Sequence, residues 1–104
     1  LHQSVPLDAA EEARLDAKEQ EFTARRAGIE NRMKTANARL ADAIRSDPRW
    51  SPEVEAITLE IESAAAELQR ATLEHVFQMR DGLDPEHRAT YDDALIGALN
   101  RGAK

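Results

Sequence analysis

The placement of helix-breaking residues constrains the fold of this chain more than any other feature. The 104 residues include only four Gly and four Pro, and no proline lies between residues 7 and 47 or between 53 and 84. A proline inside a helix removes a hydrogen bond and costs about 3 kcal/mol, so Pro48, Pro52 and Pro85 mark the limits of long uninterrupted stretches. The sequence therefore predicts three helices after a short lead, with the lead at 1–7 and the helices at 8–46, 52–81 and 85–101.

Each predicted helix begins with a recognisable start signal. Asp8 and Glu11 have the spacing of a capping box, in which each side chain bonds the backbone N–H of the other. The two later helices begin with an N-cap residue followed by proline at the first helical position, Ser51-Pro52 and Asp84-Pro85. Gly82 is expected to end the second helix.

Apolar residues recur every seven positions, which is typical of helices packed on helices. One column of the first helix reads Leu15, Phe22, Ile29, Ala36 and Ala43, and the second column reads Glu19, Arg26, Met33 and Leu40. In the second helix the columns are Val54, Ile61, Leu68 and His75, and Thr58, Ala65, Thr72 and Met79. With 41% hydrophobic residues, 33% charged residues and four aromatic side chains, the chain suits a single all-α domain with a thin core.

The short connection around Trp50 forces the first two helices into an antiparallel hairpin, and Trp50 is expected to cover its closed end. A stripe along the third helix is expected to fold it back against the open end, through Tyr91, Leu95, Ile96 and Leu99.

Three core positions hold polar or soft side chains. His75 and Met79 are four residues apart, so they lie on one face of a helix, and the antiparallel pairing places Glu19 level with Met79 and one turn from His75. An imidazole, a carboxylate and a thioether without a thiolate suit nickel, cobalt, zinc or copper better than magnesium or calcium. His2, in the lead, emerges at the same end and is a candidate for a second imidazole ligand.

A purely structural interpretation of the same residues remains open. Glu19 can pair with Arg26 or Arg80, His75 can be a hydrogen-bonded core histidine, and Met79 can fill a gap in the core. The tight second turn allows His87 to lie close to Met79, but His87 is rather expected to be a solvated or capping side chain at the start of the third helix.

Several functions are disfavoured by what the chain contains. The net charge is -6 and the Arg residues are interspersed with carboxylates, so we expect no nucleic-acid partner. There is no cysteine, no apolar run of the roughly 20 residues that a membrane span needs, no Gly-rich phosphate loop and no His-Glu-x-x-His pair. We therefore expect that the protein is not an enzyme and that it has no enzyme substrate among its partners.

The chain resembles, over essentially its full length, the periplasmic sensor domain of bacterial nickel and cobalt resistance systems, the CnrX/NccX family. The residues that carry the resemblance are Glu19, the lead His2-Gln-Ser-Val-Pro-Leu-Asp8, Ala41-Asp-Ala-Ile44, Trp50-Ser-Pro-Glu-Val-Glu55, Leu68-Gln-Arg-Ala-Thr-Leu73, His75-Val-Phe-Gln-Met79 and Pro85-Glu-His-Arg88.

The resemblance implies a hooked helical hairpin that forms a homodimer, on a protein anchored in the inner membrane by a segment that precedes this chain. It implies that His2, Glu19, His75 and Met79 bind a divalent metal, with Met79 engaged by nickel or cobalt and left out by zinc. The family pattern has a further histidine four residues before the position of His2, upstream of the first residue here. Metal binding would act on a membrane-bound anti-sigma protein and release a sigma factor that turns on efflux genes.

Two alternative functions belong to other classes. One is a periplasmic helical-hairpin stress chaperone, although the Leu-Thr-x-x-Gln motifs of those proteins are absent. The other is a dimerisation module that binds no ligand.

Overall fold

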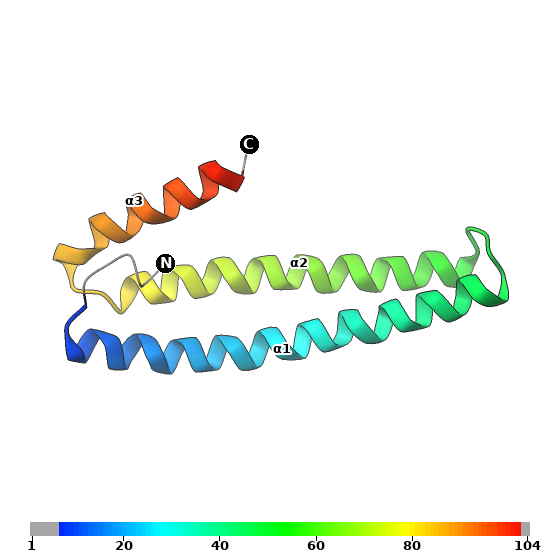
Figure 1. Cartoon of the computed structure of the whole chain (residues 1–104), viewed down its shortest axis with the longest axis horizontal. Helices are drawn as coiled ribbons and strands as arrows, with labels where there is room; N and C mark the ends of the chain where they lie inside the picture. The colour runs from blue at the N-terminus through cyan, green and yellow to red at the C-terminus, as the bar shows by residue number, and fades with distance from the viewer. Residues whose placement is uncertain (1–6, 103–104) are drawn as a thin grey trace. The chain divides into compact units, whose positions relative to one another are not determined.

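The computed structural model of the protein describes residues 7–102, and this range contains three helices and no strand (Figure 1). The helices are α1 (Ala9–Ser46), α2 (Pro52–Asp81) and α3 (Pro85–Gly102). The all-α class predicted from the sequence is therefore confirmed. None of the helices within 7–102 combines the length and the apolar content that crossing a membrane requires.

Capping side chains determine where α1 and α2 begin. Asp8 Oδ1 accepts the N–H of Glu11 at 2.8 Å, and Glu11 Oε1 accepts the N–H of Asp8 at 3.2 Å. This reciprocal pair is the predicted capping box, and α1 begins one residue after Asp8 because Asp8 is its N-cap. Ser51 Oγ caps α2 in the same way, by accepting the N–H of Val54 at 3.1 Å.

The chain divides into two compact units, one formed by 22–73 and the other by the residues up to 21 together with those from 74 onward. The expectation of a single domain stays a prediction. Within 22–73, α1 and α2 run antiparallel, since Arg39 pairs with Glu60 and Arg32 with Glu67. A step of one heptad along α1 is thus matched by one heptad back along α2.

Small side chains dominate the core of the 22–73 unit. Its buried hydrophobic residues are Ile29, Ala36, Ala43, Val54, Ile57, Ala64 and Ala71. The first column predicted for α1 is buried or half-buried, whereas the second column predicted for α2 is wrong at Ala65 and Thr72, which are exposed, and right at Met79, which is buried. The residues one position earlier, Ala64 and Ala71, are buried instead, because the seam steps by three residues from Val54 to Ile57 and then by four to Ile61, the reverse of the predicted order.

The prediction for Trp50 is also wrong, because its side chain is 65% exposed. In this unit only α1 and α2 meet at the connection, so no third element is present to cover the indole.

The other unit has a separate core at the start of α1. Leu15, Met79, Leu83 and Tyr91 are buried together, and Leu7 and Val76 pack against them; we call these four buried residues the Met79 cluster. Tyr91 is the buried residue of α3, and its hydroxyl donates to the carbonyl of Val76 at 3.0 Å. The remainder of the predicted α3 stripe is less covered, since Ile96 and Leu99 are more than half exposed.

Gly82 follows Asp81, the last residue of α2, as the sequence predicted. Its φ is not positive, so it does not adopt the left-handed conformation that is common for glycine at this position. A Cβ at this position would lie 3.2 Å from Leu15 Cδ2 and 3.4 Å from the carbonyl oxygen of Met79. The missing side chain therefore lets α1 approach the end of α2 closely.

Candidate metal centre

The side chains of Glu19 in α1 and His75 in α2 are in contact within the unit formed by the residues up to 21 and those from 74 onward. The distance between His75 Nε2 and Glu19 Oε1 is 3.0 Å. His75 is 8% exposed, whereas the Glu19 side chain is 40% exposed, so the pair extends from the core to the surface. Of the partners considered for Glu19, Arg26 pairs with Glu30 and Arg80 pairs with Asp92.

Met79 lies one turn beyond His75 on the buried face of α2. It is 3% exposed and belongs to the Met79 cluster together with Leu15, Leu83 and Tyr91. Leu7, the last residue of the lead, packs against the same cluster. His2, the remaining predicted ligand, lies outside the described residues.

The distance within this pair is compatible with two ligands of one ion. Two donor atoms at right angles, each about 2.1 Å from a transition metal, lie about 3 Å apart. His75 Nε2 and Glu19 Oε1 are 3.0 Å apart, and binding one ion would require the imidazole and the carboxylate to turn so that both lone pairs point at it. An imidazole nitrogen and a carboxylate oxygen, with a thioether one helical turn further along α2, favour a borderline divalent ion.

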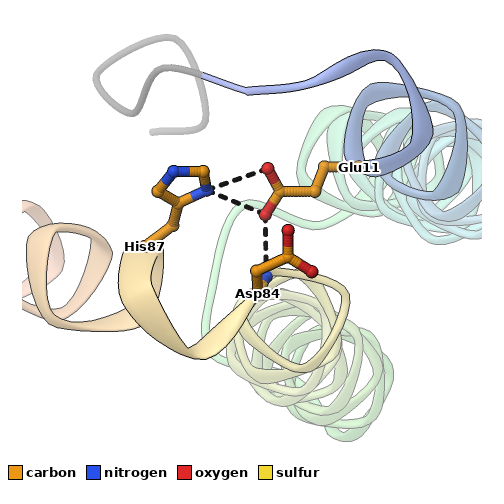
Figure 2. Close-up of side chains that lie close together, drawn as sticks. All are labelled: Glu11, Asp84 and His87. Carbon is orange, nitrogen blue, oxygen red and sulfur yellow. Dashed lines mark hydrogen bonds and ion pairs between the residues drawn. The ribbon is translucent and has the colours of Figure 1, made fainter.

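A second group of titratable residues lies at the start of α1, where α2 passes into α3 (Figure 2). Ligand-capable atoms of Glu11, Asp84 and His87 all lie within 4.8 Å of one another. Glu11 is fully buried, and its Oε2 accepts the N–H of Asp84 at 2.7 Å. The same carboxylate contacts His87 Nδ1 through both oxygens, at 2.8 and 2.9 Å.

The pKa values of this group follow from those bonds. The N–H of Asp84, with help from His87 and Asp8, lowers the pKa of Glu11 to about 2 against the opposing effect of burial. The hydrogen bond to Glu11 raises the pKa of His87. Burial, and then the carboxylates of Glu11 and Asp8, raise the pKa of Asp84. Glu11 is an ionised carboxylate whose oxygens already accept N–H groups, so we interpret the group as an ion-pair network.

The expectation for His87 is therefore corrected, because its ring is bonded to Glu11 rather than solvated. The sequence held a signal for this contact. Glu11 is part of the cap of α1, and His87 follows the Asp84-Pro85 start of α3. Because α2 runs antiparallel to α1, the first turn of α3 begins near the first turn of α1.

Two Arg side chains strengthen the same end of the molecule. Arg80 of α2 donates a bidentate pair of hydrogen bonds to the carboxylate of Asp92 of α3, at 2.7 and 3.1 Å. Arg14 of α1 donates through Nε to the carbonyl of Gly82 at 3.1 Å, and its guanidinium lies 3.6 Å from Asp84. These contacts connect α1 to the α2–α3 turn and α2 to α3.

Comparison with known proteins identifies the family to which this helical chain belongs. The family model described as heavy-metal resistance matches residues 1–90, and the chain belongs to this family. The chain is 60% identical, over all of its 104 residues and 70% of the relative, to the nickel and cobalt resistance protein CnrR of Cupriavidus metallidurans. The predicted membership of a metal-resistance family is thus confirmed, and the protein has a role in heavy-metal resistance.

Proposed function

We propose that the protein is a periplasmic sensor of nickel or cobalt, with zinc as a poorer fit, and that it acts by signalling rather than by catalysis. The observation that carries the proposal is the 3.0 Å approach of Glu19 to His75, with Met79 one turn away. In the proposed site His2, Glu19, His75 and Met79 bind the metal.

The choice of metal rests on the donor set. A thioether is a soft ligand that adds little for zinc in a site already supplied with imidazole and carboxylate, but completes a higher coordination number for nickel or cobalt. The relative with 60% identity is named as a nickel and cobalt resistance protein, which supports the same metals here.

Sensing requires that the metal favour one of two arrangements. The metal-free arrangement holds Glu19 and His75 by a shared hydrogen bond, and the metal-bound arrangement adds His2 and so fixes the lead. The end of the lead already packs, through Leu7, on the cluster that contains Met79. We propose that fixing the lead is the event that is passed to a membrane anchor upstream of this chain.

The further steps follow the family resemblance. We propose that the signal reaches a membrane-bound anti-sigma protein, which releases a sigma factor for efflux genes. A second copy of the chain is the proposed partner of α3, because Ile96 and Leu99 expose apolar surface that association would cover.

The test is calorimetric titration of the chain, and of a version extended upstream, with nickel, cobalt and zinc. Glu19→Gln and His75→Gln should each weaken nickel binding at least tenfold, while Met79→Leu should weaken nickel and cobalt but leave zinc unchanged. Matched controls are Glu60→Gln and Met33→Leu, which alter the same residue types in the 22–73 unit. A titration with no heat for any metal, as a chaperone or a ligand-free dimerisation module would give, overturns the proposal.

A further inference from the structure

One buried carboxylate serves the starts of two helices. Glu11 Oε1 accepts the N–H of Asp8 and so completes the cap of α1, while Glu11 Oε2 accepts the N–H of Asp84, the N-cap residue of α3. The first turn of α1 and the first turn of α3 are thus held by the same side chain. We call the five residues Asp8, Glu11, Arg14, Asp84 and His87 the joint.

The joint carries more negative than positive charge. Its carboxylates are Asp8, Glu11 and Asp84, and its permanent cation is Arg14, 3.6 Å from Asp84. His87 supplies the second positive charge only when it is protonated, and then its Nδ1–H donates to Glu11 as a charge-assisted bond.

Two further carboxylates near His87 favour the protonated ring, whereas burial opposes protonation. Glu86, the preceding residue on α3, lies 4.0 Å from His87 Nε2, and Asp84 lies in the adjoining turn. When the ring loses its proton, three carboxylates of the joint face the single guanidinium of Arg14. Like charges that are close together and partly buried repel one another, and the joint is then less favourable.

We propose that the joint is a pH-operated latch, in which protonated His87 holds the first turn of α3 against the first turn of α1 and neutral His87 releases it. The proposed release is limited to the start of α3, because the buried Tyr91 and the Arg80–Asp92 ion pair attach the helix further along. This device acts without metal and is separate from the Glu19–His75 site.

The direction of the pH effect follows from the shifts. His87 has a raised pKa, so its contribution is complete below the ordinary value of 6.5 and is lost as pH rises through the pKa of the closed latch. Glu11, with a pKa of about 2, stays ionised over that whole range. The latch therefore opens as pH rises above the ordinary histidine pKa of 6.5.

Hydrogen exchange followed by NMR on the metal-free chain between pH 6 and 8.5 tests the latch, with each rate corrected for the intrinsic rate at that pH. Protection of the amides of 87–90 should fall severalfold as pH rises, by about tenfold for each unit between the closed and open pKa values of His87. The amides of 54–64, in the unit without a histidine, supply the internal control.

Two variants complete the experiment. His87→Gln keeps a neutral hydrogen-bond donor and should make the protection of 87–90 independent of pH, while Glu11→Gln should return the imidazole titration of His87 toward its ordinary value. Should either variant fail to fold, the wild-type imidazole titration alone decides, because its midpoint must coincide with the loss of protection. Protection that stays constant with pH in the wild type, or that changes equally in His87→Gln, overturns the latch.

Discussion

The carboxylate of Glu11 accepts the backbone N–H of Asp84 at 2.7 Å, a bond between residues 73 positions apart in the chain. It is the largest cause of the low pKa of Glu11. A side chain that a sequence would assign only to capping its own helix therefore also fixes where α3 begins. The stability of this end of the molecule is consequently linked to the ionisation of one buried acid.

Replacement of Glu11 by Gln should lower the free energy of unfolding at neutral pH and should make that free energy depend less on pH in the acid range. The folded pKa is about 2 and the ordinary value is 4.5, so the unfolded chain binds more protons between them. The contribution of Glu11 is therefore complete above about pH 4.5 and is lost as pH falls toward 2. Urea unfolding at pH 7, 4.5 and 2.5 should give a difference in midpoint between wild type and variant that shrinks on acidification. Equal differences at all three pH values would contradict the account.

Met79 combines a packing role with the proposed ligand role, and two substitutions separate them. Met79→Ala leaves a cavity in the Met79 cluster and should cost about 2–5 kcal/mol of unfolding free energy. Met79→Leu conserves volume and should cost less than about 1.5 kcal/mol, yet weaken nickel binding. Denaturant unfolding and calorimetry on the same samples check both values. Nickel affinity that follows stability rather than the presence of sulfur would assign Met79 to packing alone.

Acid should weaken nickel binding. An imidazole binds a metal only when it is neutral, so protons compete with the ion for any histidine ligand. Calorimetry in buffers of different ionisation enthalpy at pH 7.5 and 6 should show proton release on binding and a lower affinity at pH 6. Binding with no proton release at either pH would argue against a histidine ligand.

Two glycines should respond in opposite ways to alanine. Gly28 lies inside α1 with nothing within 4 Å of an added Cβ, so Gly28→Ala should raise stability by up to about 1 kcal/mol. At Gly82 the Cβ would meet Leu15 Cδ2 at 3.2 Å, so Gly82→Ala should give no gain. Thermal unfolding of the two variants provides the comparison, and a stabilised Gly82→Ala would show that α1 and the end of α2 are not closely packed.

Charges on the exposed face of α3 should prevent association of two copies. Ile96→Glu combined with Leu99→Glu should convert the proposed dimer to a monomer in sedimentation velocity without loss of helix content. Leu59→Glu, at a residue 60% exposed in the other unit, is the matched control and should leave the dimer intact. A wild-type chain that sediments as a monomer would exclude the proposed homodimer.

The local signals of the sequence predicted the helices well because prolines and caps act within a few residues. The starts at Asp8 and Ser51 are set by side chains that bond their own first turns. The approach of Glu19 to His75 followed from antiparallel pairing alone. By contrast, the heptad pattern allows either Ile57 or Thr58 to face α1. Which of the two is buried depends on how α2 is rotated about its axis against α1, and in the structure it is Ile57.

The contact between Glu11 and His87 could not be predicted from periodicity. It joins residues of α1 and α3 through a turn whose geometry depends on how closely Gly82 approaches Leu15. A capping pattern specifies the bonds within one helix, and the second partner of the same carboxylate comes from tertiary structure.

The packing of Leu7 on the Met79 cluster fixes one end of a short tether. The proposed ligand His2 lies five residues before Leu7 in the sequence, and five residues span at most about 18 Å. The effective concentration of a tethered ligand falls as its tether lengthens. In the proposed site the number of residues between His2 and Leu7 therefore influences metal affinity, and inserting Gly-Ser pairs there should weaken nickel binding stepwise without altering any proposed ligand.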